Sequence, residues 1–206
     1  MNVTNLWSVP IYQSYIDLDI DGTLEYIKEQ AFETDPLGIS QYTVNKYVHK
    51  DDYMKDIVLK VKEQSKIYID QVLGYDINND YSIEIKTSWA ARAKPGGYCN
   101  RHYHGMSLIT GILYLSVDSI NKSNKVLFHN PHNSNSYMRL PIAKWNEHNC
   151  LVYSVVPEPK KFVLFPSNID HSTEENTTNE NLYSIVFDFN VRGVLGKGSH
   201  SETFFS

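Results

Sequence analysis

The sequence lacks the features that would place the protein in a membrane, on nucleic acid or in a disulfide-bonded secreted scaffold. Its 206 residues include only two cysteines, Cys99 and Cys150, which are too few for a disulfide framework and favour a reducing cytoplasm. The net charge of −5 argues against a basic surface for nucleic acid or anionic lipid. No apolar run approaches the ~18 residues of a membrane span, and no leader-like segment is expected at the start. These absences predict a soluble, cytoplasmic protein.

The sequence has the length and the aromatic content of a single β-rich domain. Aromatic residues make up 13% of the chain, with 15 Tyr and 8 Phe, and such side chains pack well on pleated sheets. Apolar residues recur at helical spacing in residues 21–32 and 51–74. From residue 81 the apolar period changes to two, which is typical of strands; the expected strands are 83–93, 108–117, 125–128, 161–165 and 182–191, with a further short one at 9–12. We therefore predict one α+β, mainly β domain over 1–206, with helical support in 1–80 and a strand core in 81–206.

The most informative segment is Arg101-His102-Tyr103-His104, which precedes a strong apolar strand. Residues i and i+2 of an extended chain point to the same side, with Cα atoms about 6.6 Å apart, so both imidazoles can face one point. A third histidine, His171, follows the apolar run that ends at Pro166. Three such side chains could bind one face of a divalent metal and leave the opposite face open for substrate.

The remaining histidines and the cysteines show no comparable pattern. His129 and His132 fall in a turn-like segment, and we assign structural roles to them and to His49, His148 and His200. Cys99 lies three residues before His102, but no second spaced cysteine accompanies it, so we expect it to serve packing. The sequence shows no phosphate-binding glycine loop and no serine nucleophile motif.

Several short motifs, in order, resemble a family of small 2-oxoglutarate/Fe(II)-dependent oxygenases of bacteria and their phages. They are the Trp-led segment from Trp89 to His104 with its Gly96-Gly97 turn, the strand from Thr110 to Leu115, and Leu164-Phe165-Pro166-Ser167 followed by His171. The resemblance covers nearly the whole chain and extends, more distantly, to prolyl hydroxylases. It implies a double-stranded β-helix (jelly roll) with supporting N-terminal helices, working in the cytoplasm of the host if the gene is phage-encoded.

The resemblance also implies a chemistry. Fe(II), 2-oxoglutarate and O₂ would act together, with formation of succinate and CO₂ and hydroxylation of a substrate such as a peptidyl proline side chain. His102, His104 and His171 would be the iron ligands. The wider superfamily commonly has a carboxylate where this sequence has His104. Asp170 and Asp188 are therefore candidate substitute or outer-sphere carboxylates.

The base that related enzymes place after the distal histidine, to bind the far carboxylate of 2-oxoglutarate, is missing here, because Glu180 to Ser184 contains no Lys or Arg. We expect Arg92 to take this role, on an inward face shared with Ala90 and Lys94, and Arg192 is the second candidate. The resemblance further implies Tyr114 and Ser184 as contacts of 2-oxoglutarate. Residues expected along the approach of the substrate are Tyr98 and Arg101.

Two other functions fit the same histidines. A cupin-like metalloprotein would bind Zn, Mn or Fe through three histidines without 2-oxoglutarate, although the glutamate that cupins usually carry soon after H-x-H is absent from Gly105 to Leu108. A non-catalytic jelly-roll module would need no convergent histidines. Binding of a metal, and of 2-oxoglutarate to that metal, separates the three hypotheses.

Overall fold

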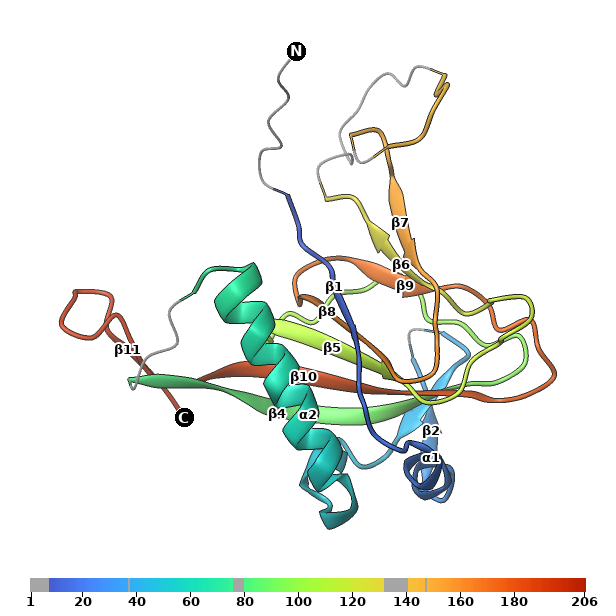
Figure 1. The fold of residues 1–206 in the computed structure, drawn as a ribbon, viewed down its shortest axis with the longest axis horizontal. Helices are drawn as coiled ribbons and strands as arrows, with labels where there is room; N and C mark the ends of the chain where they lie inside the picture. Colours follow the sequence, from blue (N-terminus) through green and yellow to red (C-terminus); the bar gives the residue numbers. More distant parts are fainter. Residues whose placement is uncertain (1–7, 37, 76–79, 132–140, 147) are drawn as a thin grey trace.

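The fold consists of two antiparallel sheets that face each other, with helices on the outer side of the larger sheet (Figure 1). The computed structural model describes residues 8–36, 38–75, 80–131, 141–146 and 148–206. His132 lies outside these residues, so its expected place in a turn stays a prediction.

The larger sheet has eight strands, seven of which follow one another across it. From one edge to the other they are β1 (Tyr12–Tyr15), β8 (Lys161–Pro166), β5 (Ile109–Tyr114), β10 (Leu182–Leu195), β4 (Tyr81–Ala93), β3 (Gln41–Thr43) and β2 (Phe32–Thr34), and β11 (Thr203–Phe205) pairs with β10. The smaller sheet has the order β7 (Val152–Val155), β6 (Val126–His129) and β9 (His171–Thr173). This mainly β, antiparallel architecture confirms the predicted fold class.

The helices cover the outer face of the larger sheet. Helix α1 spans Asp21–Lys28, and α2 spans Lys55–Ile67 and crosses the sheet in Figure 1. Two 3₁₀ turns, Val48–Lys50 and Asp52–Met54, precede α2, and a π-helical turn, Tyr68–Val72, continues it. In α2, Ile57 and Val61 recur at a spacing of four and are buried against the sheet, because that spacing aligns side chains on one helix face. Among the described residues, no helix is long and apolar enough to cross a membrane.

The alternation of side chains along β5 and β10 separates two hydrophobic regions. Leu113, Ile185 and Phe187 face the helices and belong to the core on that side. Ile112 and Val186 face the smaller sheet, where they pack with residues such as Phe128 and Phe165. Because successive residues of a strand point to opposite faces, each of these two strands contributes to both regions.

Close packing in the outer core depends on Gly111 of β5. A Cβ atom at this position would lie 2.6 Å from Cζ of Phe162, which is fully buried and packs edge-on against Phe187. A glycine here lets the Phe162 ring lie directly on the β5 backbone.

The N-terminal part of the chain contributes more to the sheet than its sequence pattern indicates. Strands β1, β2 and β3 all lie within the first 80 residues, and β1 pairs with β8 while β3 pairs with β4. The division into a helical support over 1–80 and a strand core over 81–206 is therefore not strict. The short strand expected at 9–12 is observed as β1, which begins only at Tyr12, whereas β2 and β3 have three residues each and are too brief to show an apolar alternation.

Candidate active site

Three histidines meet between the two sheets. One ring nitrogen from each of His102, His104 and His171 can be chosen so that all three lie within 4.8 Å of one another. The ring centroids are 4.4 Å apart for His102 and His171, 5.1 Å for His104 and His171, and 5.3 Å for His102 and His104. The sequence prediction that these three side chains converge is confirmed in geometry.

Backbone hydrogen bonds bring the histidines together. The segment carrying H-x-H continues the smaller sheet, because His102 and His171 form an isolated antiparallel bridge. The amide of His104 donates to the carbonyl oxygen of Ser167 at 2.9 Å. The main chain of the Phe-Pro-Ser motif therefore positions His104 directly.

The hydrogen bonds of the rings point one nitrogen of each histidine toward a common centre. Nδ1 of His102 donates to Asn100 O at 2.8 Å, and Nδ1 of His171 donates to Ile169 O at 3.0 Å. Nδ1 of His104 donates to Oδ1 of Asp188 at 2.7 Å. Each ring is left with Nε2 as its available lone pair, and Nε2 of His102 and Nε2 of His104 lie 3.3 Å apart. Two nitrogens bound to one metal at the usual ~2.1 Å would be about 3.0–3.4 Å apart, so this pair of nitrogens has the spacing expected around a shared cation.

Burial keeps the imidazoles of His102 and His171 neutral. Burial, and next the neighbouring His102, lower the pKa of His171 to about 3. Burial also lowers the pKa of His102. A metal binds the neutral imidazole, so the two side chains are in the form needed for coordination at neutral pH.

A buried polar network lies behind His104. Thr110 Oγ1 donates to the same Oδ1 of Asp188 at 2.8 Å, and the Ser167 hydroxyl lies 2.8 Å from Thr110 Oγ1. Thr110 and Ser167 are fully buried, and Asp188 is 8% exposed. Of the two carboxylates considered from the sequence, Asp188 is thus hydrogen-bonded to a histidine of the cluster. Asp170 forms an ion pair with Arg101 instead, at 2.5 Å.

The histidines open into a cavity of about 390 Å³. One side of it, formed by β5 and β10, presents Ile112, Tyr114, Ser184 and Val186. The adjoining side is formed by β4, β3 and the segments next to β3, with the residues Asp35, Ser40, Gln41, Tyr42, Lys46, Thr87 and Trp89. The volume is in the range of small-molecule sites.

Tyr114 places a free hydroxyl group in this cavity. The side chain is 5% exposed, and within the described part of the chain its hydroxyl has no hydrogen-bond partner. Burial raises the pKa of Tyr114, so the phenol stays protonated and can donate a hydrogen bond. Ser184 lies directly across from Tyr114 in the β5–β10 pairing and also faces the cavity.

The expected role of Arg92 is wrong, because its strand presents the other face to the cavity. Trp89, Ala91 and Ala93 of β4 line the cavity, so Arg92 points to the helix side. There its guanidinium donates to Oε1 of Gln41, with Nε at 2.9 Å, and stacks 4.1 Å from the centroid of Phe32. Arg192 is exposed on a distant part of β10, opposite Ser82, and does not line the cavity either.

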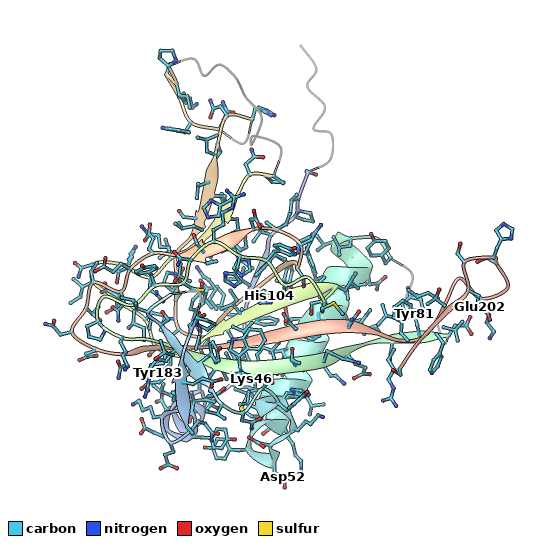
Figure 2. The ribbon with its side chains drawn as sticks, turned by 180° about the vertical axis from the view of Figure 1, so that it is seen from behind. Lys46, Asp52, Tyr81, His104, Tyr183 and Glu202 are labelled. Atoms are coloured by element: carbon cyan, nitrogen blue, oxygen red, sulfur yellow. The ribbon has the colours of Figure 1, made fainter. Side chains whose placement is uncertain are left out.

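Lys46 was not recognised from the sequence, and it is the one cationic side chain among the described residues that line the cavity. Its Nζ lies 3.6 Å from the centroid of the Tyr42 ring and 2.9 Å from Oε1 of Glu33. Figure 2 shows Lys46 near β4 and His104 near β5, and the Lys46 carbonyl accepts from the amide of Ser88 in β4. No local motif marks this lysine, because its place depends on how the β3 segment packs beside β4.

The remaining predicted residues lie outside the cavity lining. Arg101 is held by Asp170, and the Tyr98 carbonyl oxygen accepts the amides of Ile39 and Ser40. Cys99, which we expected to serve packing, lines the cavity, and its thiol donates to Oδ2 of Asp35 at 3.2 Å. Burial and the Asp35 carboxylate raise the pKa of Cys99, which keeps the thiol protonated.

Residues 87–188 match the model of a protein family described as "Putative 2OG-Fe(II) oxygenase". This match assigns residues 87–188 to that oxygenase family. The matched segment contains all three histidines of the cluster as well as Tyr114 and Ser184. The protein is thus an oxidoreductase that uses Fe(II), 2-oxoglutarate and O₂, and this decides against the cupin-like and non-catalytic alternatives.

Solved structures with the same fold include oxygenases of several kinds. A prolyl-4-hydroxylase from Pseudomonas putida is 14% identical, with a TM-score of 0.59, over 89% of this chain and 93% of that one. An oxidoreductase of the 2OG-Fe(II) oxygenase family from Burkholderia pseudomallei is 9% identical, with a TM-score of 0.61, over 87% and 84%. HygX from Streptomyces hygroscopicus, solved with nickel and 2-oxoglutarate, is 9% identical, with a TM-score of 0.60, over 88% and 83%. No curated protein sequence matches the oxygenase. At these identities the likenesses show the fold, which confirms the jelly roll.

Proposed function

We propose that His102, His104 and His171 hold the Fe(II) of this oxygenase through their Nε2 atoms. The observation that carries the assignment is the convergence of three imidazoles whose Nδ1 atoms are all engaged elsewhere. Three ligands on one side of the metal leave the cavity side open for 2-oxoglutarate and O₂. Bound iron and 2-oxoglutarate supply the oxidation, in which 2-oxoglutarate and O₂ give succinate and CO₂ and one oxygen atom enters a C–H bond of the substrate.

We place 2-oxoglutarate in the half of the cavity formed by β5 and β10. There the hydroxyls of Tyr114 and Ser184, on directly paired residues, can donate to its far carboxylate. Charge-assisted hydrogen bonds of this kind are stronger than those between neutral groups. Ile112 and Val186 line the same half and exclude water around the cosubstrate.

The prime substrate then approaches over the adjoining half of the cavity, formed by β3 and β4. That half has aromatic walls, Trp89 and Tyr42, and one side chain of each charge, Lys46 and Asp35. A peptidyl side chain such as proline fits an open, mixed surface of this kind, and prolyl hydroxylases are among the proteins with the same fold. The two free cysteines fit action in a reducing cytoplasm.

Anaerobic addition of Fe(II) and then 2-oxoglutarate tests the site assignment. A weak visible charge-transfer band that requires both additions, and that is lost in His104→Ala and His171→Ala, is the expected result. A band of unchanged intensity in either variant would show that the replaced histidine is not an iron ligand. For the substrate, succinate formation is compared with proline-containing peptides, free proline and no addition. Stimulation by the peptides alone supports the peptidyl assignment, and stimulation by free proline contradicts it.

A further inference from the structure

The three histidines of the cluster differ in what their Nδ1 atoms contact. Those of His102 and His171 donate to backbone carbonyl oxygens, of Asn100 and Ile169. The Nδ1 of His104 donates to a carboxylate oxygen of Asp188, at 2.7 Å. The histidine at the sequence position where the superfamily commonly has a carboxylate ligand is thus the one with a carboxylate partner.

Several contacts fix Asp188 in this position. It lies opposite Thr110 in the β5–β10 pairing, and Thr110 Oγ1 donates to Oδ1 at 2.8 Å. The Thr110 hydroxyl contacts the buried Ser167 hydroxyl at 2.8 Å. The pairing of β10 with β4 shifts register between Asp188 and Phe189, which marks a bulge, and bulges often redirect a side chain beside a site.

A carboxylate hydrogen-bonded to a ligand imidazole changes the ligand in two ways. It holds the ring in one orientation with Nε2 toward the metal, and it makes Nε2 a stronger donor. It also supplies negative charge close to the cation in a medium of low polarity, where charge interactions are strong. A site with three neutral imidazoles has no such charge of its own.

We propose that Asp188 is a positioning residue that gives the iron site its negative charge through His104, in place of a carboxylate bound to the metal. The inference rests on the proposed iron ligands and goes beyond them. It predicts that the His104–Asp188 pair acts as one anionic ligand, so that the charge of residue 188, and not only its hydrogen bond, determines how firmly Fe(II) is held.

The test measures the dissociation constant of Fe(II), by anaerobic competition with a chromophoric chelator, and the Fe(III)/Fe(II) midpoint potential. Asp188→Asn keeps the shape and the acceptor oxygen but removes the charge. We expect about 10- to 100-fold weaker Fe(II) binding and a higher potential, because Fe(III) loses more stabilisation than Fe(II). Asp170→Asn is the matched control, since Asp170 adjoins His171 but pairs with Arg101. It should change the dissociation constant of Fe(II) by no more than about threefold and shift the midpoint potential by no more than the equivalent free energy.

If circular dichroism shows that metal-free Asp188→Asn is poorly folded, a second variant still tests the proposal. In His104→Asp/Asp188→Asn the carboxylate returns to the metal, so Fe(II) binding should be tighter than in Asp188→Asn alone. Asp188→Asn with wild-type affinity and potential, or a double variant no better than the single one, overturns the proposal while wild-type Fe(II) binding stands. Wild-type protein that binds no Fe(II) would instead overturn the proposed iron ligands themselves, and this inference with them.

Discussion

His102 and His171 exchange a reciprocal pair of backbone hydrogen bonds, His102 N to His171 O at 2.9 Å and His171 N to His102 O at 2.8 Å. Residues 69 positions apart in the sequence are therefore direct neighbours in the smaller sheet. This main-chain pairing places the two imidazole side chains next to each other. Such a preformed site should bind a cation without a large rearrangement.

Replacing His171 should abolish firm iron binding. His171→Ala removes one of three proposed ligands, so we expect Fe(II) affinity to fall by more than the roughly 10- to 100-fold typical of changes behind a ligand. Anaerobic Fe(II) titration measures the effect. The matched control is His129→Ala, because His129 lies on the neighbouring strand β6 with its Nε2 hydrogen-bonded to Ser172 and is not part of the cluster. Equal losses in the two variants would contradict the assignment.

Removing the Tyr114 hydroxyl should weaken 2-oxoglutarate binding. A hydrogen bond to a charged group contributes about 1.5–3 kcal/mol, so Tyr114→Phe should raise the dissociation constant of 2-oxoglutarate by about 10-fold or more. Titration of the charge-transfer band of the Fe(II) complex provides the measurement. Arg92→Gln should leave this constant unchanged, because Arg92 faces Gln41 and Phe32 on the other side of β4. A large effect of Arg92→Gln with none of Tyr114→Phe would reverse our placement of the cosubstrate.

The metal-free protein should lose stability as the pH falls below the ordinary pKa of histidine. The pKa of His171 is about 3 in the folded protein and 6.5 in the reference state, so between these values the unfolded chain binds one more proton than the folded one. The contribution is fully present above pH 6.5 and is lost as the pH falls toward 3, with a slope of up to about 1.4 kcal/mol per pH unit. Urea unfolding of wild type and His171→Ala at several pH values compares the slopes. The variant should show a shallower slope, and equal slopes would contradict the assignment.

Adding one methyl group at Gly111 should destabilise the fold. The new Cβ would lie 2.6 Å from Phe162 Cζ, and overpacking of this kind costs about 1–3 kcal/mol. Chemical denaturation of Gly111→Ala measures the loss. If the clash is the cause, Gly111→Ala/Phe162→Leu should be less destabilised than the sum of the two single variants, because the shorter side chain leaves room. Additive losses would point to the backbone of residue 111 instead.

One property of strands explains why the histidine cluster was predicted correctly and why the position of Arg92 was not. Period-two alternation places His102 and His104 on one side of the chain whichever way that side faces. For Arg92 the facing direction itself matters, and residues 89–93 read Trp-Ala-Ala-Arg-Ala, with small residues on both faces. Both faces of β4 are covered, one by the helix-side core and one by the cavity. The alternation of side chains therefore cannot show which face of β4 packs against the core and which lines the cavity.

Contacts between segments that are far apart in the sequence were the hardest to predict. The Asp188 contact with His104 joins residues 84 positions apart, so Asp188 could be named as a candidate but not placed. Lys46 and Asp35 reach the cavity only because β3 extends the sheet beyond β4, and a three-residue strand leaves no recognisable period. By contrast, Tyr114 and Ser184, which the family resemblance indicated as contacts of 2-oxoglutarate, do line the cavity.

Strand β10 forms a wall shared by two compartments. Ile185, Phe187 and Phe189 support the helices, while Ser184, Val186 and Asp188 lie on the cavity side. A change of packing beneath the helices can therefore move the cosubstrate side and the partner of His104 by the same shift of backbone. In protein engineering, the shared strand therefore couples thermal stability to the properties of the iron site. Variants selected for a firmer outer core should be screened for iron retention at the same time, because neither property can be adjusted on this strand alone.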